Sequence, residues 1–395
     1  MTEPTDIRRA PAASRPLRVV DGFSTKCVPN DIVELFRGPG GWAEGLRMLG
    51  LADIGLEWDT AACRTAHAAG HATIQTDVAA YPTDLFKDRI KGLIASPPCQ
   101  AWSRAGKRGG VADQALVHQA VRDLAHGRDT RTELLVQCKD KRSLLAAEPM
   151  RWLYDLRPEW ACLEEVPDVL PLFQQYAGIL RGWGYSVWVG ILNAADYGVP
   201  QTRKRAILLA SRIRRVTAPD PTHAKCPATD LFGGRPAAWV SMADALGLPS
   251  GVTVNTRGDR PRDGRGRAVG GNEFTADGPS NALTGRARSW KLRSGQGWKL
   301  PSGDVERYER ALSEPAFTIT STANRCKWVG DGVEERNLTL AEAAILQSFP
   351  TDHPFHGTRT KQFEQVGNAV PPLLAAHIVS VPTGIPVRPA LGVAA

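Results

Sequence analysis

The fold of this chain follows from one segment, Asp31-Ile-Val-Glu-Leu-Phe-Arg-Gly-Pro-Gly-Gly41. Its first six residues are mostly apolar and predict a buried strand, and the glycines after them predict a tight turn. From Trp42 to Gly50 the apolar residues recur at helical spacing. A strand, a glycine turn and a helix begin many nucleotide-binding units, because the helix N-terminus offers free N–H groups to a ligand. The spacing is not GxGxxG, so the turn alone is a weak signal.

Two more short strands are predicted, at 52–56 and 73–77, and an acidic residue lies at the end of each. Glu57 follows the first run and Asp77 ends the second. Carboxyl ends of parallel strands meet at one edge of a sheet, where such acids commonly bind ribose hydroxyls. Trp58 lies beside Glu57 and could cover one face of an adenine ring. These units predict a doubly wound α/β sheet that holds an adenosine-type ligand.

A cysteine follows the next predicted strand. Leu93-Ile-Ala95 is a short apolar run, and Ser96-Pro97-Pro98 ends it because proline lacks an N–H and restricts the residue before it. Cys99 therefore comes directly after the carboxyl end of a strand. A partly exposed thiol at that edge could act as a nucleophile if nearby positive charge activated it. Most buried cysteines are inert, so Cys99 alone does not decide the function.

The combination of motifs is more specific than any one of them. In this order the chain resembles the DNA (cytosine-5) methyltransferases, on six blocks: Asp31–Gly41, Glu57-Trp58 with Asp77, Pro97–Gln100, Glu164–Val166, Gln201–Arg205 and Gln365–Pro372. The resemblance runs from Asp31 to about Val379. It implies an α/β, Rossmann-like S-adenosylmethionine-dependent methyltransferase fold with a smaller, irregular target recognition domain. It also implies S-adenosylmethionine as the cofactor.

The resemblance assigns catalytic roles to four residues. It implies that Cys99 attacks cytosine C6 and that Glu164 holds the target base at N3. It further implies that Arg205 contacts the cytosine O2 and that Arg203 contacts the active-site phosphate or loop. Glu165 departs from the family, which has asparagine at this position. A second carboxylate there could repel Glu164 or raise its pKa.

The cofactor site implied by the resemblance draws on several separate segments. Leu145 is expected on a helix over 143–156, and the last block is expected to return beside the first. No pair of cysteines has metal-ligand spacing, so no metal site is predicted. The residues expected to bind the cofactor are Phe36, Gly38, Gly40, Gly41, Glu57, Trp58, Asp77, Val78, Pro97, Leu145, Asn368 and Val370.

Charge and composition indicate the partner. The chain has 395 residues and a net charge of +8. Residues 251–300 contain ten Arg or Lys and four acids, so this segment carries +6. A localised basic segment is typical of a protein that binds a polyanion, and double-stranded DNA is the expected partner. Arg286 and Arg288 are the arginines we expect to read bases, and Arg260 serves as the comparison.

Five regions are expected along the chain. Residues 1–28 form a disordered arm, 29–210 the catalytic and cofactor-binding domain, 211–325 the target recognition region, 326–380 a segment that returns to the catalytic domain, and 381–395 a tail. No apolar run is long enough to span a bilayer, and residues 1–18 are not expected to act as a secretory signal because they lack an apolar segment. Scattered cysteines fit a reducing cytoplasm. We expect a cytoplasmic monomer without membrane contact, and a cognate restriction endonuclease cannot be read from the sequence.

The predicted activity is methyl transfer from S-adenosylmethionine to C5 of a flipped cytosine in DNA, through a covalent cysteine adduct at C6. Two alternatives remain open at this stage. A related group with the same blocks methylates cytosine in tRNA, although the long basic segment favours DNA. The second alternative is a catalytically impaired relative that binds DNA, and Glu165 is the only residue that indicates it. A dinucleotide oxidoreductase is disfavoured because GxGxxG is missing.

Overall fold

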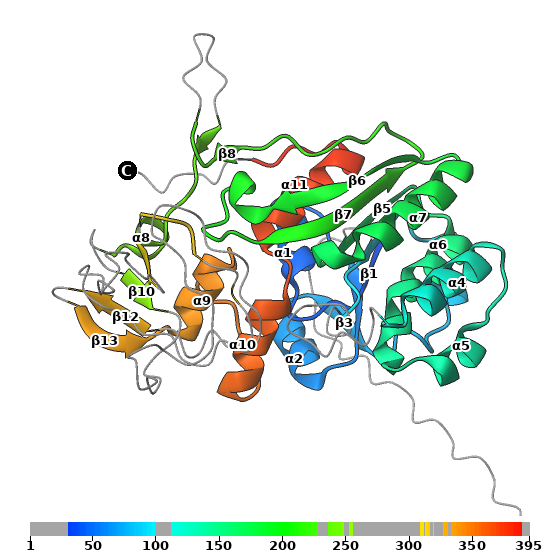
Figure 1. Cartoon of the computed structure of the whole chain (residues 1–395), viewed down its shortest axis with the longest axis horizontal. Helices are drawn as coiled ribbons and strands as arrows, with labels where there is room; N and C mark the ends of the chain where they lie inside the picture. The colour runs from blue at the N-terminus through cyan, green and yellow to red at the C-terminus, as the bar shows by residue number, and fades with distance from the viewer. Residues whose placement is uncertain are drawn as a thin grey trace, which may run out of the picture.

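A computed structural model describes residues 31–98, 112–227, 236–248, 253–255, 309–311, 313–316, 319, 327–330 and 333–388. A seven-stranded sheet forms its centre, in the order β3-β2-β1-β4-β5-β7-β6 (Figure 1). Strands β1 to β5 pair in parallel, and β7 runs antiparallel between β5 and β6. The strands are β1 (Ile32–Leu35), β2 (Ile54–Glu57), β3 (Ala72–Gln75), β4 (Gly92–Ala95), β5 (Trp160–Glu165), β6 (Ser186–Asn193) and β7 (Lys204–Ser211).

The strand order reverses at β1, which has β2 on one side and β4 on the other. Leu35 pairs with both Leu56 and Ala95, so these three strands end at the same level. Ligands of open α/β sheets bind beyond the carboxyl ends of the strands at such a reversal. The register therefore brings Phe36, Glu57 and the segment after Ala95 to one edge.

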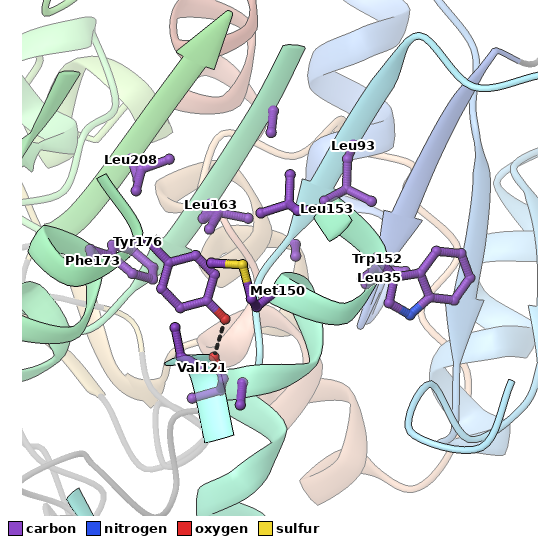
Figure 2. Packing of buried hydrophobic residues seen from close by; sticks show 14 of the residues in the cluster. Leu35, Leu93, Val121, Met150, Trp152, Leu153, Leu163, Phe173, Tyr176 and Leu208 are labelled. Carbon is purple, nitrogen blue, oxygen red and sulfur yellow. Dashed lines mark hydrogen bonds between the residues drawn. The ribbon is translucent and has the colours of Figure 1, made fainter. Parts of the chain in front are cut away.

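Helices cover both faces of the sheet (Figure 1). Because side chains alternate along a strand, Val33 of β1 packs on one face and its neighbour Ile32 on the other. The Val33 face packs against α4 (Gln114–Ala125), α6 (Glu148–Leu156) and α7 (Leu170–Gly182). The Ile32 face packs against α1 (Gly41–Met48) and α11 (Pro372–Thr383). Figure 2 shows part of the first core, where the Tyr176 hydroxyl donates to the Ala146 carbonyl at 2.9 Å.

The other helices include a segment that differs from its prediction. The segment predicted as one helix over 143–156 is instead a 3₁₀ turn, η3 (Lys141–Ala147), followed by α6. Pro149 explains the break, because it occupies the first turn of α6 and has no N–H to continue an earlier helix. The others are α2 (Thr60–Ala68), η1 (Asp84–Phe86), α5 (Arg131–Gln137), η4 (Pro167–Val169), η5 (Ala194–Tyr197), α8 (Met242–Leu246), α9 (Leu340–Leu346) and α10 (Arg359–Asn368).

The predicted recognition region contains more regular structure than its sequence indicates. Four antiparallel strands form a small sheet in the order β11-β10-β12-β13, at the opposite end of the molecule from α5 (Figure 1). They are β10 (Thr253–Asn255), β11 (Glu309–Ala311), β12 (Lys327–Gly330) and β13 (Val333–Asn337). The sheet crosses the boundary expected at residue 325 and ends at Asn337. A two-stranded pair, β8 (His223–Ala224) and β9 (Ala237–Ala238), precedes it.

Several expectations fall outside the described residues: the arm 1–28, the nucleophile Cys99, and the arginines Arg260, Arg286 and Arg288. At the other end, α11 continues to Thr383 and so includes the first three residues of the tail that was expected to start at 381. Within the part of the chain that the structure describes, no helix has the length and apolar character to cross a membrane.

Candidate active site

The turn after β1 has a backbone conformation that few residues adopt. Phe36 has a φ of 60°, and Gly38 and Gly40 have φ values of 58° and 99°. A positive φ at a bulky residue such as phenylalanine costs on the order of 1–3 kcal/mol, so the surroundings must hold it. Gly41 is needed for space, since a Cβ there would lie 2.2 Å from the Val370 carbonyl oxygen. The structure thus joins the first and last predicted blocks at Gly41.

Glu57 holds this glycine turn by accepting three backbone hydrogen bonds. Its Oε2 accepts from the N–H of Gly38 at 2.7 Å. Its Oε1 accepts from the N–H groups of Trp58 and Asp59, at 2.8 and 2.7 Å. Burial raises the pKa of Glu57, and these backbone donors oppose the shift. A carboxylate has about four acceptor positions, so one position remains for a ligand hydroxyl.

The buried side chain of Arg37 anchors the turn through contacts with Glu34 of β1 and with Asp53, which precedes β2. Its guanidinium is buried, with Nη2 2.5 Å from Asp53 Oδ2 and Nε 3.3 Å from Glu34 Oε2. The side chain passes over Gly55, where a Cβ would lie 1.5 Å from the Arg37 Nε. The charges of Asp53 and Glu34 outweigh burial and raise the pKa of Arg37. This buried ion cluster was not predicted, although a glutamate within an apolar strand is a signal for it.

Side chains of α5 and α6 hold the turn after β3. Asp77 Oδ1 accepts from the N–H of Ala79 at 2.9 Å, and Val78 is buried. Arg151 of α6 donates to the Val78 carbonyl at 2.6 Å. Glu148 binds Arg151 at 3.0 Å and also binds Arg131 of α5, which donates to the Ala79 carbonyl at 2.9 Å. Arg131, Glu148 and Arg151 fix the turn that carries Asp77, a role that no local pattern predicts.

The other predicted cofactor residues lie in different surroundings. Pro97 is buried after β4, and its neighbour Ser96 accepts a hydrogen bond from the Trp42 indole at 2.8 Å. Leu145 is half-buried in η3. Asn368 is exposed at the end of α10. Trp58 is 71% exposed at the edge of the site.

The end of β5 carries the predicted catalytic carboxylate. Glu164 is 5% exposed, and its Oε1 lies 2.9 Å from the Arg205 Nε. Leu163 pairs with Ala95 of β4, so Glu164 is level with Ser96, three residues before Cys99. Glu164 and Arg205 were predicted together, and the structure brings them together. Their ion pair keeps the carboxylate in place beside the segment that leads to the thiol.

Glu165 has few partners. It is 1% exposed, its Oε2 accepts from the Val166 N–H at 2.6 Å, and its Oε1 has no hydrogen-bond partner among the described residues. Burial, together with the negative charge of Glu164, raises the pKa of Glu165 well above its ordinary value. The extra carboxyl group therefore favours the neutral form.

Arg203 contacts the backbone of two segments that lie far from it in the sequence. Its side chain is buried, and its Nη1 donates to the carbonyls of Gly367 at 2.9 Å and Ile319 at 3.3 Å. Gln201, also buried, accepts from the Ile319 N–H at 2.8 Å and binds the side chain of Gln347. These contacts connect the start of β7 to segments on both sides of β12 and β13. Gln347 was not predicted.

The residues at the edge fit an adenosyl ligand with a charged tail. A glycine turn opens onto a helix N-terminus, a carboxylate with a remaining acceptor position follows β2, and an exposed indole lies beside it. These groups match a ribose, an adenine face and a small charged group. The chemistry of this donor set therefore fits the predicted cofactor.

Comparison with known proteins identifies the class. Residues 30–125 and 135–381 match the model of the family C-5 cytosine-specific DNA methylase. The chain therefore belongs to this family and is a DNA (cytosine-5-)-methyltransferase with the α/β, Rossmann-like methyltransferase fold. Members of the family generally use S-adenosylmethionine.

Individual relatives cover most of the chain. The Type II methyltransferase M1.HphI of Haemophilus parahaemolyticus is 28% identical over 370 residues, which are 89% of this chain and 86% of the relative. The Type II methyltransferase M.DdeI of Desulfomicrobium norvegicum is 27% identical over 388 residues, covering 87% and 86%. A solved structure of an Escherichia coli prophage protein, titled as a DNA modification methyltransferase, has a TM-score of 0.53 at 18% identity and covers 90% of this chain and 98% of its own.

Proposed function

We propose that this enzyme methylates C5 of a cytosine flipped out of double-stranded DNA, through a covalent bond between Cys99 and cytosine C6. The observation that supports this mechanism best is the ion pair between the buried Glu164 and Arg205, beside the strand that leads to Cys99. Cytosine C5 is a poor nucleophile. Addition of a thiolate at C6 moves electron density to C5, so the reaction needs a thiol and an acid together.

Each residue has a defined part in this mechanism. Cys99 Sγ forms the bond to C6 as the C5–C6 double bond breaks, and after methyl transfer the loss of the C5 proton re-forms that double bond and releases the Cys99 thiolate. Glu164 holds or protonates N3 and so absorbs the charge that develops as the adduct forms. Arg205 keeps the Glu164 carboxylate oriented and contributes electrostatic stabilisation at O2. A base inside a duplex cannot reach these groups, so the cytosine must leave the stack at a cost of a few kcal/mol.

The cofactor is expected at the carboxyl ends of β1, β2, β3 and β4. Glu57 and Asp77 would hold its ribose and adenine, and the glycine turn would face its charged tail. When bound, S-adenosylmethionine supplies the electrophilic methyl group. The basic segment 251–300 would contact DNA, since lysine and arginine neutralise phosphates.

The test is transfer of a labelled methyl group from S-adenosylmethionine to duplex DNA, with tRNA as the competing substrate. Cys99→Ser should abolish transfer and leave DNA binding intact, because a serine hydroxyl is a much weaker nucleophile at neutral pH. Cys226→Ser is the matched control, since Cys226 is an exposed free cysteine, and it should behave as wild type. Appreciable turnover by Cys99→Ser would rule out the mechanism, and labelling of tRNA alone would rule out the substrate.

A further inference from the structure

A segment between the two ranges that match the family model contacts the proposed cofactor site. Residues 126–134 connect α4 to α5 and include the first turn of α5, and the family pattern does not account for them. Asp123, in the last turn of α4, holds the start of the segment. Its carboxylate accepts from Arg128 Nη2 at 2.7 Å and from the Thr130 hydroxyl at 2.9 Å. The segment therefore has a defined shape where α5 begins.

The next acidic residue orients the guanidinium of Arg131, the first residue of α5. Asp129 Oδ1 accepts from Arg131 Nε at 2.8 Å, and Asp129 Oδ2 accepts from Arg131 Nη2 at 2.6 Å. A contact between two nitrogens of a guanidinium and two oxygens of a carboxylate fixes the plane of the guanidinium. The Arg131 side chain is only 19% exposed. Its remaining nitrogen, Nη1, is therefore held in one direction.

Arg131 Nη1 reaches the turn after β3. It donates to the Ala79 carbonyl at 2.9 Å and to Glu148 Oε1 at 2.5 Å. Glu148 Oε2 accepts from Arg151 Nε at 3.0 Å, and Arg151 also donates to the Val78 carbonyl at 2.6 Å. Glu148 is buried, so loss of either arginine would leave a buried carboxylate with one partner fewer. The two arginines together hold consecutive carbonyls of the turn.

The contact at Ala79 determines how Asp77 is held. Asp77 Oδ1 accepts from the Ala79 N–H at 2.9 Å, while the Ala79 carbonyl accepts from Arg131. Because Oδ1 binds within the turn, Oδ2 is the oxygen that a ribose or an adenine would meet. In the sheet, β2, β1 and β4 separate this turn from Glu164 at the end of β5. A change at Asp77 should therefore act on the cofactor and not on the target base.

We propose that Arg131 is a positioning residue for S-adenosylmethionine, supplied to the cofactor site by residues 126–134. By binding the Ala79 carbonyl it holds Asp77 in the orientation that the ribose or the adenine requires. This inference rests on the proposed role of Asp77 in cofactor binding. Arg131 acts through Asp77 and takes no part in methyl transfer. It should therefore set the affinity for the cofactor and leave the rate at saturation unchanged.

The experiment measures the Kd of S-adenosylmethionine by calorimetry, and kcat and KM by transfer of a labelled methyl group to duplex DNA. Arg131→Ala should raise Kd and KM for the cofactor by roughly 2-fold to 12-fold, the equivalent of one hydrogen bond, with wild-type kcat and KM for DNA. Arg131→Lys should resemble Arg131→Ala, because one ammonium cannot face both Asp129 and Ala79. Arg128→Ala removes a 69% exposed arginine of the same segment that binds Asp123, and should match wild type.

A double variant separates this inference from a purely structural role. If Arg131 acts through Asp77, Asp77→Ala with Arg131→Ala should bind the cofactor no more weakly than Asp77→Ala alone. Thermal unfolding reports whether each variant is folded. If Arg131→Ala is not, Asp129→Asn releases the guanidinium more gently and should raise Kd in the same direction. Additive losses in the double variant, full recovery by Arg131→Lys, or a fall in kcat with unchanged KM would overturn the inference.

The Asp77→Ala variant also distinguishes the two levels of the proposal. If it binds S-adenosylmethionine more weakly while Arg131→Ala binds as wild type does, this inference alone is wrong. If Asp77→Ala itself keeps the wild-type Kd, Asp77 does not belong to the cofactor site, and its proposed role and this inference are wrong together.

Discussion

Two glutamates end strands of the same sheet, Glu57 at β2 and Glu165 at β5, and their surroundings differ. Glu57 accepts three backbone N–H groups. Glu165 accepts one and has an oxygen without a hydrogen-bond partner among the described residues. Burial raises the pKa of both, but at Glu57 backbone donors oppose the shift, whereas Glu164 adds to it at Glu165. Glu57 therefore organises the glycine turn, whereas burying Glu165 with so few donors destabilises the fold.

Of the substitutions that test this difference, Glu57→Ala is expected to have the largest effect. Glu57→Ala removes the acceptor of three N–H groups and releases Gly38, so the glycine turn loses its shape. S-adenosylmethionine affinity should fall by about 1–3 kcal/mol, or roughly 5-fold to 150-fold in Kd. Calorimetry measures this directly. Glu57→Gln keeps one accepting oxygen and should lie between wild type and Glu57→Ala. An unchanged Kd for Glu57→Ala would remove Glu57 from the cofactor site.

At Glu165 the expected effect is on stability and depends on pH. The folded pKa is raised above the ordinary value of 4.5, so the folded protein keeps a proton that the unfolded chain has released. Its contribution is fully present below about pH 4.5 and is lost as the pH rises through the folded pKa. Between these limits the free energy of unfolding of wild type should fall by up to about 1.4 kcal/mol per pH unit.

Glu165→Gln should remove this slope, because an amide does not titrate. Urea unfolding at a series of pH values compares the two proteins, and Glu133→Gln serves as the control because Glu133 is exposed on α5. The gap between wild type and Glu165→Gln should widen as the pH rises. Parallel curves would show that Glu165 is ionised in the folded protein despite its burial.

The smallest effect is expected at Trp58, which is 71% exposed and contributes little to the fold. If its indole covers an adenine face, Trp58→Ala should weaken cofactor binding by about 0.5–1.5 kcal/mol, roughly 2-fold to 12-fold in Kd. The melting temperature should not change, in contrast to Glu57→Ala. Trp58→Phe should recover part of the affinity. Equal Kd values for wild type, Trp58→Ala and Trp58→Phe would show that the indole does not contact the adenine.

Local patterns were sufficient for strands β1 to β4 and for helix α1. The runs around Val33 and Leu93 show no regular alternation of apolar and polar residues, because parallel strands are buried on both faces, and Glu34 is the one charged residue within them. The segment 143–156 was harder, since its apolar spacing is helical throughout and only Pro149 marks the break. Within the recognition region, strands of three to five residues such as β10 and β13 are too short to show a period.

The sequence by itself determined the class of this protein, because strand ends, glycine turns and motif residues such as Glu164 and Arg205 are local features in a fixed order. The tertiary structure decided how those features are held. His353 meets Pro39 across 314 residues, and Arg203 meets Gly367 across 164. No local pattern encodes such pairs. Their hydrogen bonds form only where folding excludes water and leaves each buried donor and acceptor with the other as its partner.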